Sequence, residues 1–473
     1  MVFSSVIFLF AFLPITLAGY YLIRKDLRNA FLLFMSLLFY AAGEPKFVFI
    51  MTASIVVNYF LGLAIHFTLE KKAFIRRIFL VSTVLANLGL LFYYKYFDFT
   101  VTNLNRLFHL SIPLKNILLP IGISFFTFQG MSYVLDVYMK KAEVQKNPLN
   151  VALYIAFFPQ LIAGPIVRYS DVNIQIISRT ENFELFGEGV IRFVIGLAKK
   201  IILSNQFAVL ADFSFDGNLK TLSAGMAWLG AFAYAFQIYF DFSGYSDMAI
   251  GLGKMFGFNF NENFNYPYIA KSVQDFWRRW HISLSSWFRD YVYIPMGGNR
   301  TGNVYFHLIT IFFLTGLWHG ASWHYIAWGL WHGAFLLIER FFRTRTTNLS
   351  VPTFIKSIIK HTYTILVVLI GWVLFRGNGL KASVNYIFAM FGIGTNPDNT
   401  WTQFYLHDYF ITFVIGIICA VPTLSFLKSK IEKNHIACRL LNFAKPVLIG
   451  LLFVVSIAYT VTTTYNPFIY FNF

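Results

Sequence analysis

Charged residues are scarce in this sequence. Only 12% of its 473 residues are Asp, Glu, Lys or Arg, while 57% are hydrophobic. Soluble chains carry about 25% charged residues on average. A soluble fold of 54.6 kDa has too few charges here to cover its apolar side chains. The composition therefore excludes a soluble globular protein and predicts an integral membrane protein.

Cysteine is almost absent. Cys419 and Cys438 lie in neither a C-x-x-C nor a zinc-ligand pattern, which excludes a disulfide framework. The histidines His319, His324 and His332 do not follow the His-x-x-x-His spacing of zinc proteases, so we expect no metal site. We also expect no bound cofactor.

Acidic residues are also few. The sequence has 21 Asp and Glu and 38 Lys and Arg, which gives a net charge of +17. Because no soluble domain is left over to bind nucleic acid, we expect no nucleic-acid partner. The basic residues are expected to hold loops on the cytoplasmic side of a bilayer.

The first apolar run lacks a basic segment in front of it. The sequence is apolar from Val2, and the first charges are Arg24 and Lys25. This pattern predicts a retained membrane helix and not a cleaved signal peptide. The positive-inside rule then places residues 24–28 in the cytoplasm and the N-terminus outside.

Long apolar runs follow one another along the whole chain. A helix needs about 20 apolar residues to cross the hydrocarbon core. Several runs are short and one, 222–256, is too long for a simple crossing. We therefore expect an all-α, polytopic membrane protein of about a dozen helices, some broken or re-entrant, in one membrane domain over residues 1–473. The runs are 3–23, 29–42, 46–68, 78–97, 117–138, 149–167, 187–210, 222–256, 304–320, 321–342, 358–376, 382–394, 409–427 and 443–462.

Residues 261–300 are too polar to cross a bilayer. On a helix, Trp277 and Trp280 share one side, and Arg279 and Asp290 share another. This segregation predicts an amphipathic helix that lies along the membrane surface, on the cytoplasmic side.

The sharpest candidate for chemistry is His319. It lies between two apolar runs, and Gly316 and Gly320 on either side permit a break in the helix. A neutral imidazole in a dry site can take a proton from a hydroxyl, and Trp318 would help to exclude water. His332 is a second candidate. For both histidines, packing between helices is the alternative.

A second group of polar residues interrupts run 222–256. Asp241, Ser243, Tyr245 and Asp247 lie within seven residues of one another. A broken helix that carries carboxylates and hydroxyls fits the wall of a cavity. A hydrogen-bonded packing network is an equally good interpretation. No Gly-x-Ser-x-Gly elbow accompanies these serines, so a serine nucleophile is not expected.

Three motifs together carry a resemblance. Residues 276–287 read Phe-Trp-Arg-Arg-Trp-His-Ile-Ser-Leu-Ser-Ser-Trp, residues 293–298 read Tyr-Ile-Pro-Met-Gly-Gly, and residues 317–323 read Leu-Trp-His-Gly-Ala-Ser-Trp. The chain resembles the membrane-bound O-acyltransferase family (MBOAT), and within it the bacterial branch that O-acetylates exported polysaccharides such as alginate. The resemblance covers essentially the whole chain, including the closing residues 466–473.

The resemblance implies a ring of membrane helices around a central funnel. It makes His319 the catalytic histidine and His281 the second motif position. The donor is expected to be cytoplasmic acetyl-CoA, and a separate extracytoplasmic protein is expected to complete transfer to the polysaccharide.

The resemblance also suggests roles for the remaining polar residues. His319 is expected to act as general base, and His281 to orient the donor or stabilise a charged intermediate. Arg278 and Arg279 can attract the phosphates of CoA, although anchoring at the membrane surface explains them equally well. The other residues expected along the donor tunnel are Trp318, Trp280, Asp241, Ser243, Tyr245 and His332.

Two other functions compete with this one. A D-alanyl transferase for teichoic acid shares the fold and the histidine but uses a carrier-protein thioester. A transporter is the non-enzymatic alternative, because intramembrane carboxylates such as Asp241 and Asp247 occur in that class. In each case the protein is expected in the cell (inner or plasma) membrane, crossing it several times.

Overall fold

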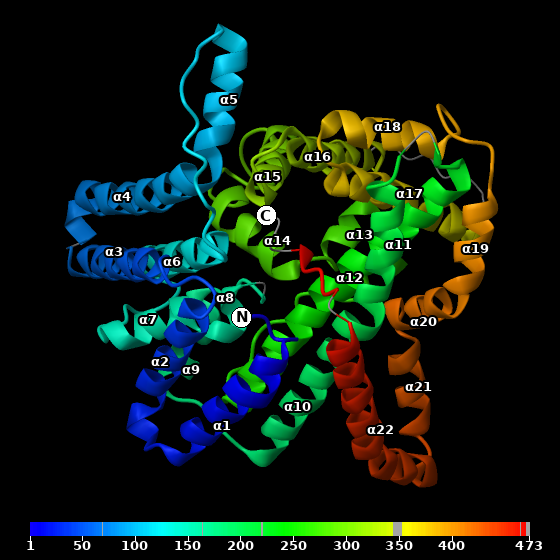
Figure 1. The fold of residues 1–473 in the computed structure, drawn as a ribbon. Helices are drawn as coiled ribbons and strands as arrows, with labels where there is room; N and C mark the ends of the chain where they lie inside the picture. The colour runs from blue at the N-terminus through cyan, green and yellow to red at the C-terminus, as the bar shows by residue number, and fades with distance from the viewer. Residues whose placement is uncertain (69, 163, 219–220, 344–351, 464, 470–473) are drawn as a thin grey trace. The chain divides into compact units, whose positions relative to one another are not determined.

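The computed structural model describes residues 1–473 except 69, 163, 219–220, 344–351, 464 and 470–473. Within the described residues every regular element is a helix (Figure 1). The predicted all-α class is therefore confirmed. The last four residues of the chain, which contribute to the resemblance, lie outside the description.

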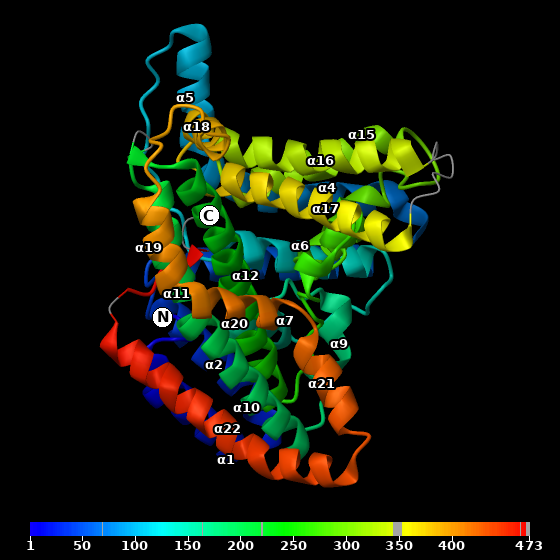
Figure 2. The same ribbon diagram turned by 90° about the vertical axis from the view of Figure 1, so that its right-hand side faces the viewer.

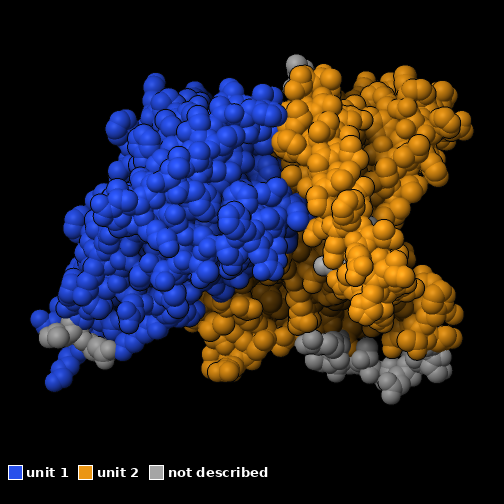
Figure 3. Space-filling view, turned by 90° about the horizontal axis from the view of Figure 1, so that it is seen from below, with its two compact units in different colours: residues 1–193, 245–261 blue, residues 194–244, 262–473 orange. Residues whose placement is uncertain are grey.

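The described chain forms two compact units (Figure 3). Unit 1 comprises Met1–Phe193 and Tyr245–Asn261, and unit 2 comprises Val194–Gly244 and Glu262–Phe473. A single membrane domain over the whole chain remains a prediction.

Unit 1 contains the N-terminal helices. An initial π-helical turn, Phe8–Phe12, leads into the first α-helix. A second π-helical turn, Phe92–Tyr96, joins α4 (Ala73–Leu91) to α5 (Phe97–Phe108). Helix α5 projects away from the rest of unit 1 in both ribbon views (Figures 1 and 2). The helices are α1 (Leu13–Leu22), α2 (Arg28–Ala41), α3 (Val48–Phe67), α4 (Ala73–Leu91), α5 (Phe97–Phe108), α6 (Ile123–Tyr138), α7 (Pro148–Ala156), α8 (Phe158–Leu161), α9 (Tyr169–Ile177) and α10 (Phe183–Ala198), whose last residues belong to unit 2.

Unit 2 contains the segment with the three motifs. Its helices are α11 (Asn205–Phe215), α12 (Ala224–Met255, of which the last part belongs to unit 1), α13 (Val273–Trp277), α14 (Ile282–Phe288), α15 (Val304–His319), α16 (Trp323–Arg343), α17 (Thr353–Arg376), α18 (Leu380–Met390), α19 (Thr400–Asp408), α20 (Phe410–Ala420), α21 (Thr423–Ile431) and α22 (His435–Thr462). Asparagine starts several of them: Asn303 accepts the Tyr305 N–H at 3.0 Å, because its side chain replaces a missing helical acceptor.

Five helical stretches in the described residues are long and apolar enough to cross a membrane, and a pair bent by 61°, α19 with α20, makes a possible sixth. The five are Val48–Phe67, Ala73–Phe108, Phe183–Phe215, Thr353–Arg376 and His435–Thr462. Shorter apolar helices such as α15 accompany them.

Three predicted elements differ from the structure. The run 222–256 forms one uninterrupted helix, α12, and not a broken one, because its polar side chains leave the backbone hydrogen bonds of the helix intact. The run 117–138 becomes helical only at Ile123, after Gly122 adopts a left-handed conformation with φ +76°. The run 149–167 divides into α7 and α8 at Phe157.

The segment 261–300 does not form the single amphipathic helix that was predicted. It contains α13 and α14, separated at His281, whose φ of +45° stops the helix. The predicted apolar side is correct, but its tryptophans Trp277 and Trp280 are buried in unit 2, against protein and not lipid.

Candidate active site

His319 is the last residue of α15 in unit 2. The chain leaves the helix through Gly320, which is extended, and α16 begins three residues later at Trp323. The predicted break at His319 is therefore confirmed. At a helix end, the imidazole lies beside backbone groups that make no hydrogen bonds within the helix.

Two glycines hold α15 against α16. A Cβ added to Gly316 would lie 2.4 Å from the Tyr325 carbonyl oxygen, and one added to Gly329 would lie 2.2 Å from the Phe312 carbonyl oxygen. Because both obstacles are backbone atoms, any larger residue would force the helices apart. The two glycines therefore fix where the end of α15 lies.

Aromatic rings surround His319. The ring centroids of Trp318, Trp328 and Phe375 lie 4.8, 4.9 and 5.0 Å from that of the imidazole. His319 is only 6% exposed. The imidazole is thus enclosed by apolar aromatic side chains.

His281 is buried beside Trp318. Its ring centroid lies 6.0 Å from that of Trp318 and 4.5 Å from that of Phe242 on α12. Trp318 also lies next to His319, so both histidines that the motifs identify are close to the same tryptophan ring. Burial lowers the pKa of His281 to about 3.

The backbone around His281 is held by a buried asparagine. Asn263 accepts the Ile282 N–H through its carbonyl at 3.0 Å and the Ser283 N–H through its side-chain Oδ1 at 3.1 Å. The same Oδ1 lies 3.2 Å from His281 Nδ1. These bonds take the N–H groups that a continuous helix would use, which explains why the helix is interrupted at His281.

His332 is fully buried on α16. Its ring lies between those of Trp277 and Trp328, with centroid distances of 5.2 and 5.4 Å. A Cβ added to Gly371 would lie 2.6 Å from its Nε2, so that side of the ring is tightly packed. Phe276 stacks on the His332 ring at a centroid distance of 6.3 Å, and Trp280 stacks on Phe276 at 5.6 Å. The structure thus brings His332 and Trp280 into the aromatic cluster of His319.

Asp241 on α12 belongs to a buried ion pair. Its Oδ1 lies 2.6 Å from Lys200 Nζ, and its Oδ2 accepts the Ile469 N–H at 3.0 Å. Lys200 Nζ also donates to the carbonyl oxygen of Pro467. Because both charged side chains are almost completely buried, the pair anchors the C-terminal segment inside unit 2.

The other residues of that polar stretch divide between the units. Ser243 is buried on α12, and its hydroxyl finds no hydrogen-bond partner in the described part of the chain. Tyr245 belongs to unit 1, where it stacks on Phe3 at 4.4 Å. Asp247, also in unit 1, pairs with Arg192 at 2.6 Å. These contacts agree with the packing interpretation of the stretch.

Arg278 and Arg279 lie outside the aromatic cluster. Arg278 is exposed, and Arg279 pairs with Asp275 at 2.9 Å on the surface of unit 2. The structure therefore places both guanidinium groups where they can meet an anion from solvent, and does not place them beside His319.

The sequence pattern did not identify Asn263 and Lys200 as partners of the candidate site residues His281 and Asp241. Asn263 stands among other asparagines in an irregular segment, and Lys200 lies in an apolar run where a basic residue usually marks a helix end. The intramembrane position of Lys200 was the available signal, because a buried lysine requires a counter-charge.

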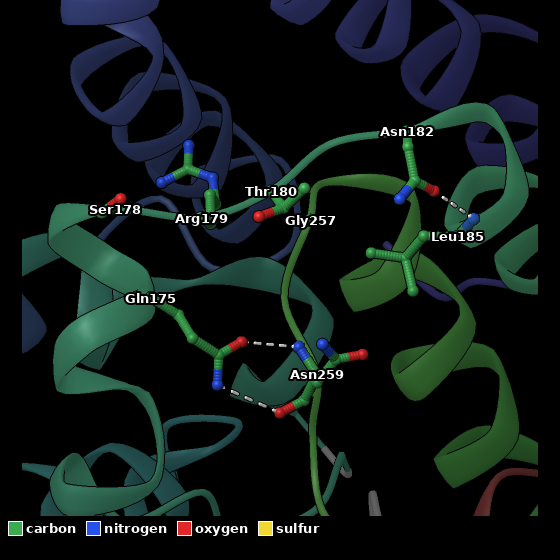
Figure 4. Close-up of a pocket in the computed structure, with 8 residues that line it drawn as sticks. All are labelled: Gln175, Ser178, Arg179, Thr180, Asn182, Leu185, Gly257 and Asn259. Carbon is green, nitrogen blue, oxygen red and sulfur yellow. Dashed lines mark hydrogen bonds between the residues drawn. The ribbon is translucent and has the colours of Figure 1, made fainter.

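Unit 1 contains a polar pocket of about 370 Å³ at the start of α10 (Figure 4). The side chain of Gln175 binds the backbone of Asn259, and Asn182 accepts the Leu185 N–H at 2.7 Å. None of the predicted site residues lines it. Its polar groups mainly hold neighbouring loops together.

Comparisons with known proteins match most or all of this chain to O-acyltransferases. The model of the membrane-bound O-acyltransferase family matches residues 79–377. A probable alginate O-acetylase of Pseudomonas putida is 41% identical, over 100% of both chains. A peptidoglycan O-acetyltransferase of Helicobacter pylori is 37% identical over 83% of this chain and 80% of its own. A teichoic acid D-alanyltransferase of Bacillus subtilis is 32% identical, but over only 49% of this chain and 61% of its own.

Proposed function

Because this chain belongs to the membrane-bound O-acyltransferase family, and is a membrane enzyme of that class, we propose that it transfers an acetyl group to an exported or cell-envelope polysaccharide. The similarity to the Pseudomonas putida protein over the full length of both chains supports this acceptor class. Membership of an acyltransferase family also favours an enzyme over a transporter.

The donor in this proposal is cytoplasmic acetyl-CoA. The exposed Arg278 and the surface residue Arg279 give unit 2 a cationic site at which phosphates can be attracted. We propose the inner or plasma membrane as the location, with these arginines on the cytoplasmic side. An extracytoplasmic partner protein would complete transfer to the sugar, so the immediate acceptor is either a hydroxyl of that partner or a sugar hydroxyl.

The chemistry assigned to His319 is general-base catalysis. Its buried position among three aromatic rings supports this role, because a neutral imidazole accepts a proton most readily where water is excluded. His319 takes the proton from the acceptor hydroxyl as that oxygen attacks the thioester carbonyl carbon. The carbon–sulfur bond then breaks, and the CoA thiolate leaves and takes up the proton.

The experiment that tests this function compares esters on the cell-surface polysaccharide. A deletion strain and the same strain carrying the wild-type gene are treated with mild base, and the released acetate and D-alanine are measured. Restored acetate supports the proposal. Restored D-alanine without acetate would identify a D-alanyl transferase, and restoration of neither ester would contradict both functions.

A further inference from the structure

A buried asparagine lies against the second motif histidine in unit 2. Asn263 is 0% exposed, and its Oδ1 faces three groups. It accepts the Ser283 N–H at 3.1 Å and the Ser283 hydroxyl at 2.9 Å, and it lies 3.2 Å from His281 Nδ1. Asn263 thus reaches both His281 and Ser283 from a segment eighteen to twenty residues earlier in the chain.

The orientation of the Asn263 amide follows from these contacts. A backbone N–H can only donate, so the atom of Asn263 that faces Ser283 N must be the acceptor Oδ1 and not Nδ2. His281 Nδ1 faces that same acceptor, and therefore carries a proton. In a neutral imidazole the other nitrogen, Nε2, then carries a lone pair.

We propose that Asn263 is a positioning residue that holds His281 in the Nδ1–H tautomer, so that Nε2 orients the substrates by accepting a hydrogen bond. This inference rests on the proposed acyl transfer and decides between the two roles that the resemblance left open for His281. A neutral ring with its lone pair at Nε2 cannot donate a hydrogen bond to the carbonyl oxygen on which negative charge develops. His281 therefore orients a substrate N–H or O–H group and does not stabilise the charged intermediate.

The surroundings of His281 agree with a neutral ring. Its neighbours Phe242, Trp318, Asn263 and Ser283 are all uncharged, and burial among them lowers its pKa to about 3. The left-handed backbone of His281, with φ +45°, is unfavourable for a residue other than glycine. The bonds from Asn263 to Ile282 and Ser283 hold that conformation in place.

The Nδ2 atom of Asn263 can be replaced by an oxygen without loss of a described hydrogen bond. Its Nδ2 is buried and has no acceptor among the described residues. Replacing the amide by a carboxylate in Asn263→Asp therefore breaks no hydrogen bond and keeps the acceptor that faces Ser283 and His281. Asn265, two residues along the same segment, is exposed and provides a matched control for the added charge.

The tautomer can be measured without any activity. Solid-state NMR on protein labelled with ¹⁵N-histidine in liposomes, at neutral pH, gives the protonation of each ring nitrogen, and His281→Asn identifies the His281 signals by difference. We expect a protonated Nδ1 and an unprotonated Nε2 in the wild type, and loss of this single tautomer in Asn263→Ala. A protonated Nε2 in the wild type would overturn the proposal.

The pH profile of acetyl transfer tests the catalytic consequence. In Asn263→Asp the new carboxylate raises the pKa of His281 by about 1–3 units, so Nε2 becomes protonated at higher pH. The acid limb of the profile should therefore move to higher pH by one unit or more, while Asn265→Asp keeps the wild-type profile. Asn263→Ala should lose at least tenfold activity at every pH.

The outcomes separate this inference from the proposed function. Wild-type profiles in both Asn263→Asp and Asn263→Ala, at matched membrane levels, would show that Asn263 does not position His281. Absence of any transfer from labelled acetyl-CoA by the wild type would refute the proposed donor, and the NMR result would then decide the tautomer alone. The NMR result on the wild type also decides it if neither variant accumulates in the membrane.

Discussion

The buried ion pair between Lys200 and Asp241 gives a quantitative prediction about stability. Lys200 Nζ and Asp241 Oδ1 are 2.6 Å apart, and the two side chains are only 3% and 1% exposed. Removing one partner leaves the other charge buried without compensation, which costs roughly 3–5 kcal/mol. We therefore expect Lys200→Met and Asp241→Asn each to reduce the folded-to-unfolded ratio by roughly a hundredfold or more.

The double variant should behave differently from the sum of the single ones. With Lys200→Met and Asp241→Asn combined, neither buried charge remains, and the Asn side chain can still accept the Ile469 N–H that Asp241 binds at 3.0 Å. We expect the double variant to be more stable than either single variant, because replacing a buried ion pair by neutral residues is often close to neutral.

Thermal unfolding of the detergent-solubilised protein, followed as loss of the monodisperse peak, measures this order. The surface pair of Lys254 and Glu188, whose atoms lie 2.5 Å apart but are 26% and 54% exposed, is the matched control. Its disruption should cost less than about 1 kcal/mol. If Lys200→Met and Lys254→Met destabilise the protein equally, or if the double variant is the least stable of the set, the buried pair does not act as described.

Two further predictions concern packing and pH. Gly329→Val should separate α15 from α16 and abolish activity, because its Cβ would lie 2.2 Å from a backbone oxygen. Gly450→Val on α22 is the control and should be tolerated, because a Cβ there would have nothing within 4 Å. Equal activity of the two variants would refute the helix contact. Burial raises the pKa of Glu181 in unit 1, but hydrogen bonds from Tyr20 and Arg28 and the charges of Arg28 and Arg179 outweigh it, so the pKa is lowered overall. The stability that Glu181 provides is thus present above its ordinary pKa of 4.5 and lost as the pH falls below it. The difference in melting temperature between wild type and Glu181→Gln should shrink below pH 4.5, and a difference independent of pH would contradict this account.

Most of the helices could be predicted from the sequence because apolar runs and their breaks are local signals. The helices α15 and α16 follow the predicted runs 304–320 and 321–342 almost residue by residue. The interruption at His281 was not predictable, because it depends on bonds from Asn263, eighteen residues away in the sequence. The continuity of α12 is not predictable either, because its polar side chains and its length favour a break in the sequence pattern.

The candidate site could be predicted in part for a similar reason. His319 and His281 stand in recognisable motifs, and the structure places both of them near Trp318. The role of Asp241 could not be inferred without its partner, since Lys200 and the backbone of Ile469 reach it from distant parts of the chain. Tertiary partners of buried charges are the information that a single sequence does not contain.

The central claim is that His319 performs the chemistry of an acetyltransferase. Its most direct test is the ester-linked acetate on the surface polysaccharide of a deletion strain that carries either His319→Ala or His324→Ala at matched membrane levels. His324 is the control because it is a nearby buried histidine whose ring already binds the Ser322 hydroxyl, at 2.7 Å. The account predicts no acetate with His319→Ala and near-normal acetate with His324→Ala. Normal acetate with His319→Ala would show that this histidine only packs, and would contradict the mechanism.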